Sequence, residues 1–112
     1  MSAITTHVLD TALGRPAAGV GVRLLRVAGG GAEIASSATG ADGRAGDLGP
    51  ATIEPGTYSL VFDTGAYYRA QPGQEPPFFP EVTVSFAARD SAAHYHVPVL
   101  LSPYGYTTYR GS

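Results

Sequence analysis

The chain has 112 residues, of which 44% are hydrophobic and 14% are charged, a size and composition typical of one globular domain. Its formal net charge is -2 and its seven basic residues are scattered, so we expect neither nucleic acid nor an anionic membrane surface as a partner. It contains no cysteine, which excludes disulfides, thiol nucleophiles and cysteine-ligated metals. We therefore predict a single domain over residues 1–112.

The N-terminal stretch lacks the basic start and the continuous apolar segment of a signal peptide. No apolar run approaches the roughly 18 residues needed to cross a bilayer. We therefore expect a cytoplasmic protein that does not span a membrane.

In the first predicted strand Thr5, His7 and Leu9 share one parity, so their side chains are expected on one face.

Glycine and proline divide the rest of the chain into short segments, at intervals of about ten residues, as in antiparallel sandwiches and barrels. Strands are expected over 19–27 and 33–39, joined by the three glycines at 29–31. The segment 40–44 is predicted to be a turn, because Asp-Gly tolerates positive φ angles that a strand cannot use. Arg44 leaves this turn at the start of a short strand.

The second half of the chain continues the pattern of short strands. Alternating apolar residues predict strands over 57–63 and 81–86. Between them Asp63 and Thr64 are expected to cap the one predicted helix, which runs through Arg69, and four prolines then forbid regular structure. Two last strands, over 94–101 and 105–110, are joined by a proline turn.

Few side chains are suited to chemistry, and none is specific by itself. His94 and His96 lie two residues apart on a predicted strand, which puts both on one face about 7 Å apart. Such rings are usually partly buried structural residues, but a His-x-His pair also begins some zinc sites, with His7 as a conceivable third ligand. Arg44 is ordinarily a solvated turn residue, and the segment 109–112 is ordinarily a frayed end.

Taken together, these residues form a pattern that covers nearly the whole chain. It includes Thr5-Thr-His7-Val-Leu-Asp10, Gly14-Arg-Pro-Ala17, Asp42-Gly-Arg44 and, most specifically, the stretch from His94 to Ser112. With these motifs the chain resembles the transthyretin-like family. The resemblance implies an all-β fold: an eight-stranded antiparallel β-sandwich with one short α-helix. It also implies a homotetramer, a dimer of dimers, whose active sites lie in the channel between dimers.

Within that family the terminal Tyr-Arg-Gly-Ser marks the members that hydrolyse 5-hydroxyisourate, whereas the hormone carriers lack it and lack the active-site histidines. The resemblance therefore implies conversion of this purine-derived small molecule to 2-oxo-4-hydroxy-4-carboxy-5-ureidoimidazoline in urate catabolism, without a cofactor or a metal. The implied pocket contains His7, Arg44, His96 and the terminal residues Tyr109, Arg110, Gly111 and Ser112. His94 flanks the same motif, and no catalytic step is assigned to it.

The catalytic residues expected from the resemblance are His7, Arg44, His96 and Ser112. A histidine accepts a proton from water readily near neutral pH, so His7 and His96 are the expected proton-transferring pair, in an order that is left open. Arg44 presents a planar fork of donors that can hold carbonyl oxygens and stabilise oxyanion charge. A nucleophilic serine is the less favoured route, because the motif shows no acidic third member of a triad.

Two other classes of function compete with this hypothesis. One is a carrier that holds a hydrophobic ligand in the same channel. The other is a metal-dependent hydrolase in which His7, His94 and His96 bind zinc and a zinc-bound water attacks the substrate.

Overall fold

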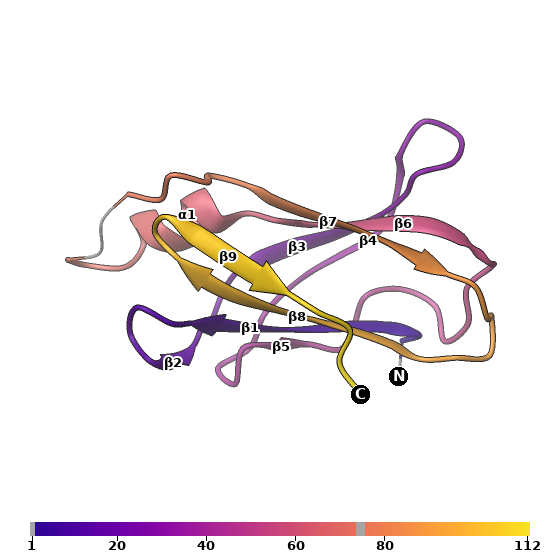
Figure 1. Cartoon of the computed structure of the whole chain (residues 1–112), viewed down its shortest axis with the longest axis horizontal. Coiled ribbons are helices and arrows are strands. Elements are labelled where there is room, and N and C mark those ends of the chain that lie inside the picture. Colours follow the sequence, from indigo (N-terminus) through magenta and orange to yellow (C-terminus); the bar gives the residue numbers. More distant parts are fainter. Residues whose placement is uncertain (1, 74–75) are drawn as a thin grey trace.

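Two β-sheets pack face to face in the computed structural model, which describes residues 2–73 and 76–112 (Figure 1). The first sheet has the strand order β2-β1-β8-β9, and a further strand, β5, pairs with β1. Its strands are β1 (Ile4–Asp10), β2 (Arg15–Pro16), β5 (Arg44–Ala45), β8 (Tyr95–Ser102) and β9 (Gly105–Thr108). This sheet contains both the first and the last strand, β1 and β9.

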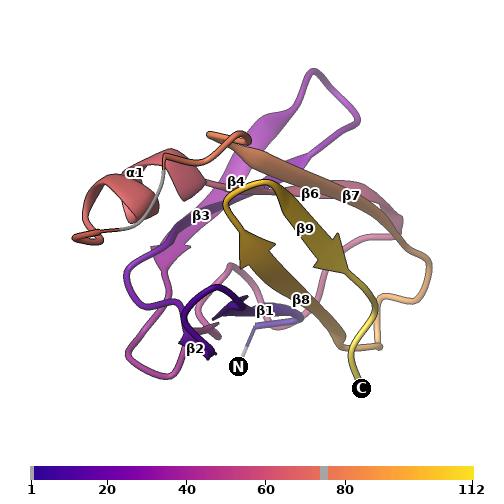
Figure 2. The ribbon, with the colours of Figure 1, turned by 60° about the vertical axis from the view of Figure 1, so that its left-hand side comes forward.

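The second sheet has the strand order β4-β3-β6-β7, and all of its pairs are antiparallel (Figure 2). Its strands are β3 (Gly21–Arg26), β4 (Ala32–Ala38), β6 (Gly56–Phe62) and β7 (Val82–Ala88). Helix α1 (Thr64–Arg69) follows β6 directly. The carboxylate of Asp63 accepts a hydrogen bond from the Ala66 N–H at 3.0 Å, which confirms the predicted cap and the extent of the helix.

One strand pair departs from the antiparallel pattern expected throughout. β1 runs parallel to β8, with Ile4 opposite Tyr95 and Asp10 opposite Leu101. Two strands of only two residues, β2 and β5, pair with the other edge of β1, and β2 was not predicted from the sequence. Because β1 lies between β5 and β8, residues from three distant parts of the chain become neighbours on one sheet.

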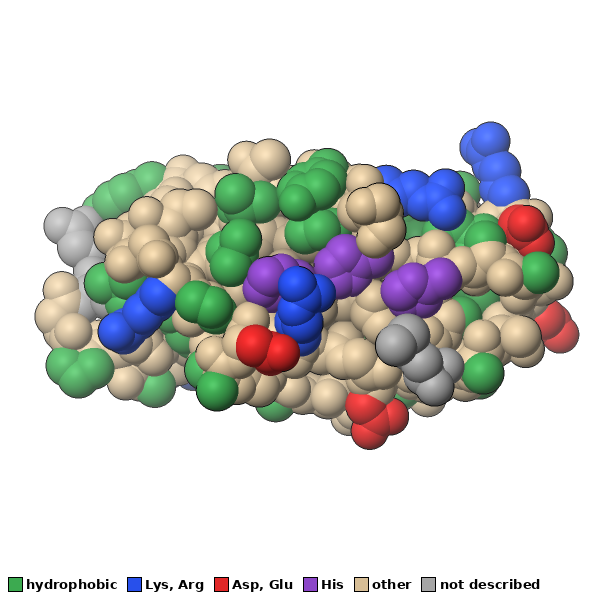
Figure 3. Space-filling model, turned by 90° about the horizontal axis from the view of Figure 1, so that it is seen from below, with side chains coloured by type: hydrophobic (Ala, Val, Ile, Leu, Met, Phe, Trp, Pro, Cys, Tyr) green, Lys and Arg blue, Asp and Glu red, His purple; other side chains and the backbone are tan. Residues whose placement is uncertain are grey.

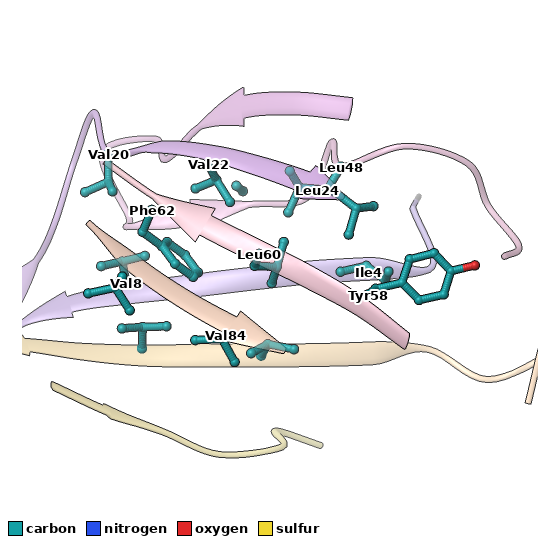
Figure 4. Close-up of a cluster of buried hydrophobic side chains, with 14 of the residues drawn as sticks. Ile4, Val8, Val20, Val22, Leu24, Leu48, Tyr58, Leu60, Phe62 and Val84 are labelled. Carbon is teal, nitrogen blue, oxygen red and sulfur yellow. The ribbon is translucent and has the colours of Figure 1, made fainter. Parts of the chain in front are cut away.

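The hydrophobic core fills the space between the two sheets (Figure 4). In β1 the inward residues Ile4 and Val8 are fully buried, as is Val99 in β8. Each fully buried aliphatic side chain of this kind contributes about 1.5–3 kcal/mol. Since neighbouring residues on a strand point to opposite faces, the alternate residues, His7 on β1 and His96 on β8, lie on the outer face of the first sheet.

A buried carboxylate joins the helix to the first sheet. Asp10 is fully buried at the end of β1, where it accepts hydrogen bonds from the Tyr67 hydroxyl at 2.7 Å and from the Leu13 N–H at 3.0 Å. Burial, together with this bond to Asp10, raises the pKa of Tyr67 above its ordinary value. The contact therefore connects α1 with the end of the strand that carries His7.

In the described part of the chain, no helix is both long enough and apolar enough to span a membrane.

Candidate active site

A pocket of about 460 Å³ lies on the outer face of the first sheet. Figure 3 shows the three histidines gathered on this face, with a basic side chain beside them. The pocket is lined by residues of β1, β5 and β8 and by the end of the chain: Thr5, Thr6, His7, Arg44, Ala45, Gly46, His94, His96, Pro98, Tyr109, Gly111 and Ser112.

The short pairing of β1 with β5 places His7 directly opposite Arg44. The Nε2 atom of His7 lies 3.0 Å from the backbone carbonyl oxygen of Asp42. A carbonyl oxygen only accepts hydrogen bonds, so Nε2 of His7 carries the proton. In the neutral ring the other nitrogen, Nδ1, therefore has a free lone pair.

The turn before Arg44 depends on Gly43. This glycine has a φ of 78°, and a Cβ atom added there would overlap the carbonyl oxygen of Val8. The Asp42 carboxylate accepts a hydrogen bond from the Arg44 N–H at 3.0 Å, and the Val8 N–H donates to the Gly43 carbonyl at 2.7 Å. The Asp-Gly turn predicted from the sequence is thus confirmed. It positions Arg44 and also the Asp42 carbonyl, which orients the ring of His7.

The parallel pairing of β1 with β8 places Thr5 opposite His96. The Thr5 hydroxyl lies 2.8 Å from Nδ1 of His96 and 3.0 Å from Nε2 of His94. His94 precedes β8 by one residue, and its ring stacks on that of His96 with the centroids 6.5 Å apart. The two rings therefore share one face at close to the spacing predicted from the strand period.

The environment of His96 lowers its pKa from the ordinary value of 6.5. Loss of solvation on burial is the largest cause, followed by the nearby positive charges of Arg44, His7 and His94. His96 is therefore held in its neutral form near pH 7, in which it can accept a proton at one nitrogen and donate one from the other.

The end of the chain is hydrogen-bonded to β8 beside the pocket and is not frayed. The Gly111 N–H donates a hydrogen bond to the His96 carbonyl at 2.8 Å, which forms a bridge beyond the end of β9. A Cβ atom at Gly111 would lie only 2.6 Å from Cδ2 of His96. Only a residue without a side chain fits at this distance, and Gly111 thereby positions Tyr109 and Ser112 along the pocket wall.

Arg110 is the one predicted site residue that does not line this pocket. Its guanidinium lies over the ring of Tyr95, 4.8 Å from the centroid, in a cation–π contact. Successive residues of an extended chain alternate in direction, so Arg110 points away when Gly111 faces His96. It lines a separate hollow next to β7.

The structure brings together the other residues expected from the sequence: His7, Arg44, His96, Tyr109, Gly111 and Ser112, with the flanking His94. Sequence reasoning missed Thr5 and the Asp42 carbonyl, both of which contact the histidine rings. The shared parity of Thr5 and His7 was the only signal for Thr5. Among the described residues, no group of three or more His, Cys, Asp or Glu side chains is arranged to hold a metal ion.

The fold and the pocket define a class of protein: a two-sheet β-sandwich that presents histidine and arginine side chains on the outer face of one sheet. The chain belongs to the HIUase/Transthyretin family, whose model matches residues 4–111. It is 47% identical over 115 residues to 5-hydroxyisourate hydrolase from Caulobacter vibrioides, with 100% of each chain covered.

Two solved structures extend the comparison to three dimensions. Klebsiella pneumoniae 5-hydroxyisourate hydrolase matches with a TM-score of 0.84 and 34% identity, covering 97% of this chain and 98% of that one. Transthyretin from Sparus aurata matches with a TM-score of 0.89 and 31% identity, covering 99% of this chain and 97% of that one. The family and the transthyretin-like fold implied by the motifs are therefore confirmed.

Proposed function

We infer that the chain is a 5-hydroxyisourate hydrolase, which opens the six-membered ring of its substrate in purine catabolism. The observation that carries this conclusion is the convergence of His7, Arg44, His96 and the terminal Gly111–Ser112 segment on one pocket. The full-length similarity to a curated 5-hydroxyisourate hydrolase supports it independently. The product is 2-oxo-4-hydroxy-4-carboxy-5-ureidoimidazoline, and no cofactor is required.

His7 is the proposed acceptor of the proton from the attacking water. Its Nε2–H donates a hydrogen bond to the Asp42 carbonyl, so the basic nitrogen is Nδ1. The same bond holds the ring in one tautomer and one orientation. A general base of this kind contributes about 100- to 10,000-fold to a rate. Removal of the proton lets the water oxygen attack the carbonyl carbon of the scissile C–N bond.

Arg44 is the proposed electrophile. Attack on the carbonyl places negative charge on its oxygen, and a guanidinium in the pocket stabilises that charge more strongly in the transition state than in the substrate. Arg44 lies on the two-residue strand next to His7, so the same turn positions the base and the oxyanion partner. Its fork of donors also suits the planar carbonyl groups of a purine-derived ring.

His96 is the proposed donor of the proton that the leaving ring nitrogen needs when the C–N bond breaks. The lowered pKa keeps His96 neutral, with a proton on one nitrogen available for transfer. Ser112 and Tyr109 are placed to hydrogen-bond or pack against the substrate ring. A nucleophilic role for Ser112 stays the less favoured route.

The complete enzyme is proposed to be a homotetramer built from one domain over residues 1–112. The pocket is open on the outer face of the first sheet, and a second pair of subunits packed on that face would exclude water from it. A cytoplasmic location stays a prediction.

The carrier hypothesis fits the same fold, since a transthyretin shares it. The lining of the pocket favours the enzyme, because it includes three histidines and an arginine, which can transfer protons and stabilise negative charge.

The test follows the ultraviolet absorbance of freshly generated 5-hydroxyisourate with and without the protein. We expect decay far faster than the spontaneous reaction, and an unchanged decay would refute the proposed function. A second arm repeats the assay after exhaustive chelation. Full activity there supports hydrolysis without a metal, whereas loss that zinc restores would favour the metal-dependent alternative.

A further inference from the structure

The hydroxyl of Thr5 connects two histidine rings, and only one of these has a role in the mechanism above. It contacts Nε2 of His94 at 3.0 Å and Nδ1 of His96 at 2.8 Å, both within hydrogen-bonding range. A hydroxyl carries one proton. Thr5 therefore donates to one ring at a time, and the other ring must donate to Thr5 for both bonds to exist.

This restriction couples the proton positions on the two rings. In the first arrangement His94 donates to Thr5 and Thr5 donates to Nδ1 of His96, so the proton of neutral His96 is on Nε2. In the second arrangement Nδ1 of His96 donates to Thr5 and Thr5 donates to His94, so Nε2 of His96 has a free lone pair. Nε2 of His96 is thus an acid in one arrangement and a base in the other.

The two ends of this chain of hydrogen bonds have different surroundings. His94 is exposed, Thr5 is only 6% exposed, and His96 is half-buried in the pocket. Because Thr5 is shielded from solvent, water competes little for its hydroxyl. Within one subunit the ring of His94 is therefore the better solvated of the two, and the ring of His96 is the more buried.

We propose that His94 and Thr5 form a proton relay that supplies a proton to His96 during the hydrolysis. The proposal rests on the proposed function and adds two positioning residues to it. As the C–N bond breaks, Nε2–H of His96 gives its proton to the leaving nitrogen. At the same time Thr5 gives its proton to Nδ1 of His96, and protonated His94 gives the proton on Nε2 to Thr5.

The protons balance over this step. His96 begins and ends neutral and changes only its tautomer, Thr5 loses one proton and gains one, and His94 passes from imidazolium to neutral imidazole. The relay resets when the proton that His7 took from the attacking water passes through water in the pocket to Nε2 of His96, and the same two hydrogen bonds run in reverse. His94 then regains its positive charge.

The relay keeps positive charge off His96, where it is least favourable. The charged and titratable groups that act on His96 are Arg44 on β5, His7 on β1 and His94 before β8, and Tyr109 also lines the pocket. Burial and the three basic groups all lower the pKa of His96. An imidazolium on the exposed ring of His94 is solvated and screened, so the transferred charge resides there at lower cost.

The first experiment replaces the hydroxyl of Thr5 in the full-length enzyme. Thr5→Val keeps the branched shape and removes the relay, so we expect kcat to fall by up to about 100-fold, the lower end of the range for acid–base catalysis, with KM little changed. Thr5→Ser retains a hydroxyl and should restore most of the rate. Thr11→Val is the matched control, because it removes a threonine bond to the carbonyl of Leu101, at the far end of β8, and should leave kcat unchanged.

The second experiment tests His94 without altering the buried residue. His94→Gln keeps an amide that can bond to Thr5 but cannot carry a proton, so a merely structural role predicts normal kcat. The relay predicts a fall similar to that of Thr5→Val, and partial rescue by added imidazole. Wild-type kcat in both Thr5→Val and His94→Gln would overturn the relay, as would a defect in Thr5→Val that Thr5→Ser does not repair.

A measurement without substrate separates this inference from the proposed function. Nitrogen NMR of the histidine rings reports which nitrogen of His96 is protonated. Titration of His94 should shift that tautomer in the wild type and not in Thr5→Val, even if the wild type proved inactive on 5-hydroxyisourate. An identical His96 response in both proteins would show that Thr5 does not couple the rings.

Discussion

His7 and His96 have the same side chain but different hydrogen-bond partners, and the partners determine what each ring can do. The Asp42 carbonyl can only accept, so it holds His7 in a single tautomer. The Thr5 hydroxyl both donates and accepts, so it permits either tautomer of His96. The proposed base is therefore held in one tautomer and the proposed proton donor can adopt either, because one ring contacts a carbonyl and the other a hydroxyl.

Arg44→Lys is the first prediction at the residue scale. Lysine keeps the positive charge but loses the planar fork, so kcat/KM should fall on the order of 100-fold while the fold is kept. The matched control is Arg23→Lys, on the second sheet, where the side chain is half-exposed and pairs with Glu33. Steady-state kinetics of both variants provide the measurement. Normal activity of Arg44→Lys would show that the planar fork of Arg44 has no role in the reaction.

The lowered pKa of His96 also predicts how the free energy of unfolding depends on pH. Its pKa is lowered in the folded protein, so below the ordinary value of 6.5 the unfolded chain binds a proton more readily than the folded one. This group therefore destabilises the fold progressively as pH falls from 6.5 to its folded pKa, and has no effect above 6.5.

Denaturant unfolding at pH 7.5 and pH 5, at one protein concentration, measures this effect. The free energy of unfolding should decrease less in His96→Asn than in the wild type over that interval. An equal decrease in both proteins would contradict the assignment. The same variant should lose about 100- to 10,000-fold in kcat, as expected for a residue that transfers a proton in the reaction.

At the scale of elements, the segment after β9 acts as part of the pocket because its backbone is anchored to β8. Gly111→Ala would drive a methyl group into the ring of His96 and against Pro98. A displacement of about 1 Å at a catalytic group costs on the order of 100-fold in rate, so activity should fall by that order with little change in stability. Deletion of residues 110–112 should have an equal or larger effect.

Gly105→Ala is the control for this prediction. Gly105 lies at the start of β9, and the nearest atom to an added Cβ would be Oγ of Ser102, at 3.6 Å. Near-normal kinetics are expected there. Full activity of the truncated protein would show that the terminus is a family marker without a role in the site.

The attachment of α1 to the sheet can be tested at Tyr67. Tyr67→Phe removes one hydrogen bond to the fully buried Asp10 and should lower the free energy of unfolding by about 1–3 kcal/mol. Tyr106→Phe, at a partly exposed position on β9, should change it by less than about 0.5 kcal/mol. Thermal or denaturant unfolding provides the comparison, and equal effects of the two variants would contradict a stabilising role for the buried bond.

At the scale of the whole molecule, the pocket lies on an outer face of the sandwich, and we therefore predict that activity requires the proposed assembly. Leu100 lies on β8 with the same outward parity as His96 and is half-buried. Leu100→Arg should disfavour packing of a second dimer on this face while the sandwich stays folded.

Sedimentation and activity measured in parallel on Leu100→Arg, and on serial dilutions of the wild type, test this prediction. Activity should decline as tetramers dissociate to dimers. Dimers with full activity would place the complete site within one subunit or one dimer.

The sequence by itself determined the features that depend on neighbouring residues. The cap at Asp63, the positive φ at Gly43 and the common face of His94 and His96 follow from local sterics and from the strand period. The whole-length motif then identified the family and most of the pocket.

Only the tertiary structure decided which groups contact one another across the chain. Thr5 and His96 are 91 residues apart, and a slip of one residue between β1 and β8 would put different side chains opposite each other. No local pattern encodes that register, so Thr5 was missed as the partner of both rings. The motif predicted that Arg110 lines the pocket, whereas in the structure its guanidinium lies over the ring of Tyr95. The reason is related: the bridge between Gly111 and His96 sets the direction of each terminal side chain, and this bridge exists only in the folded sheet.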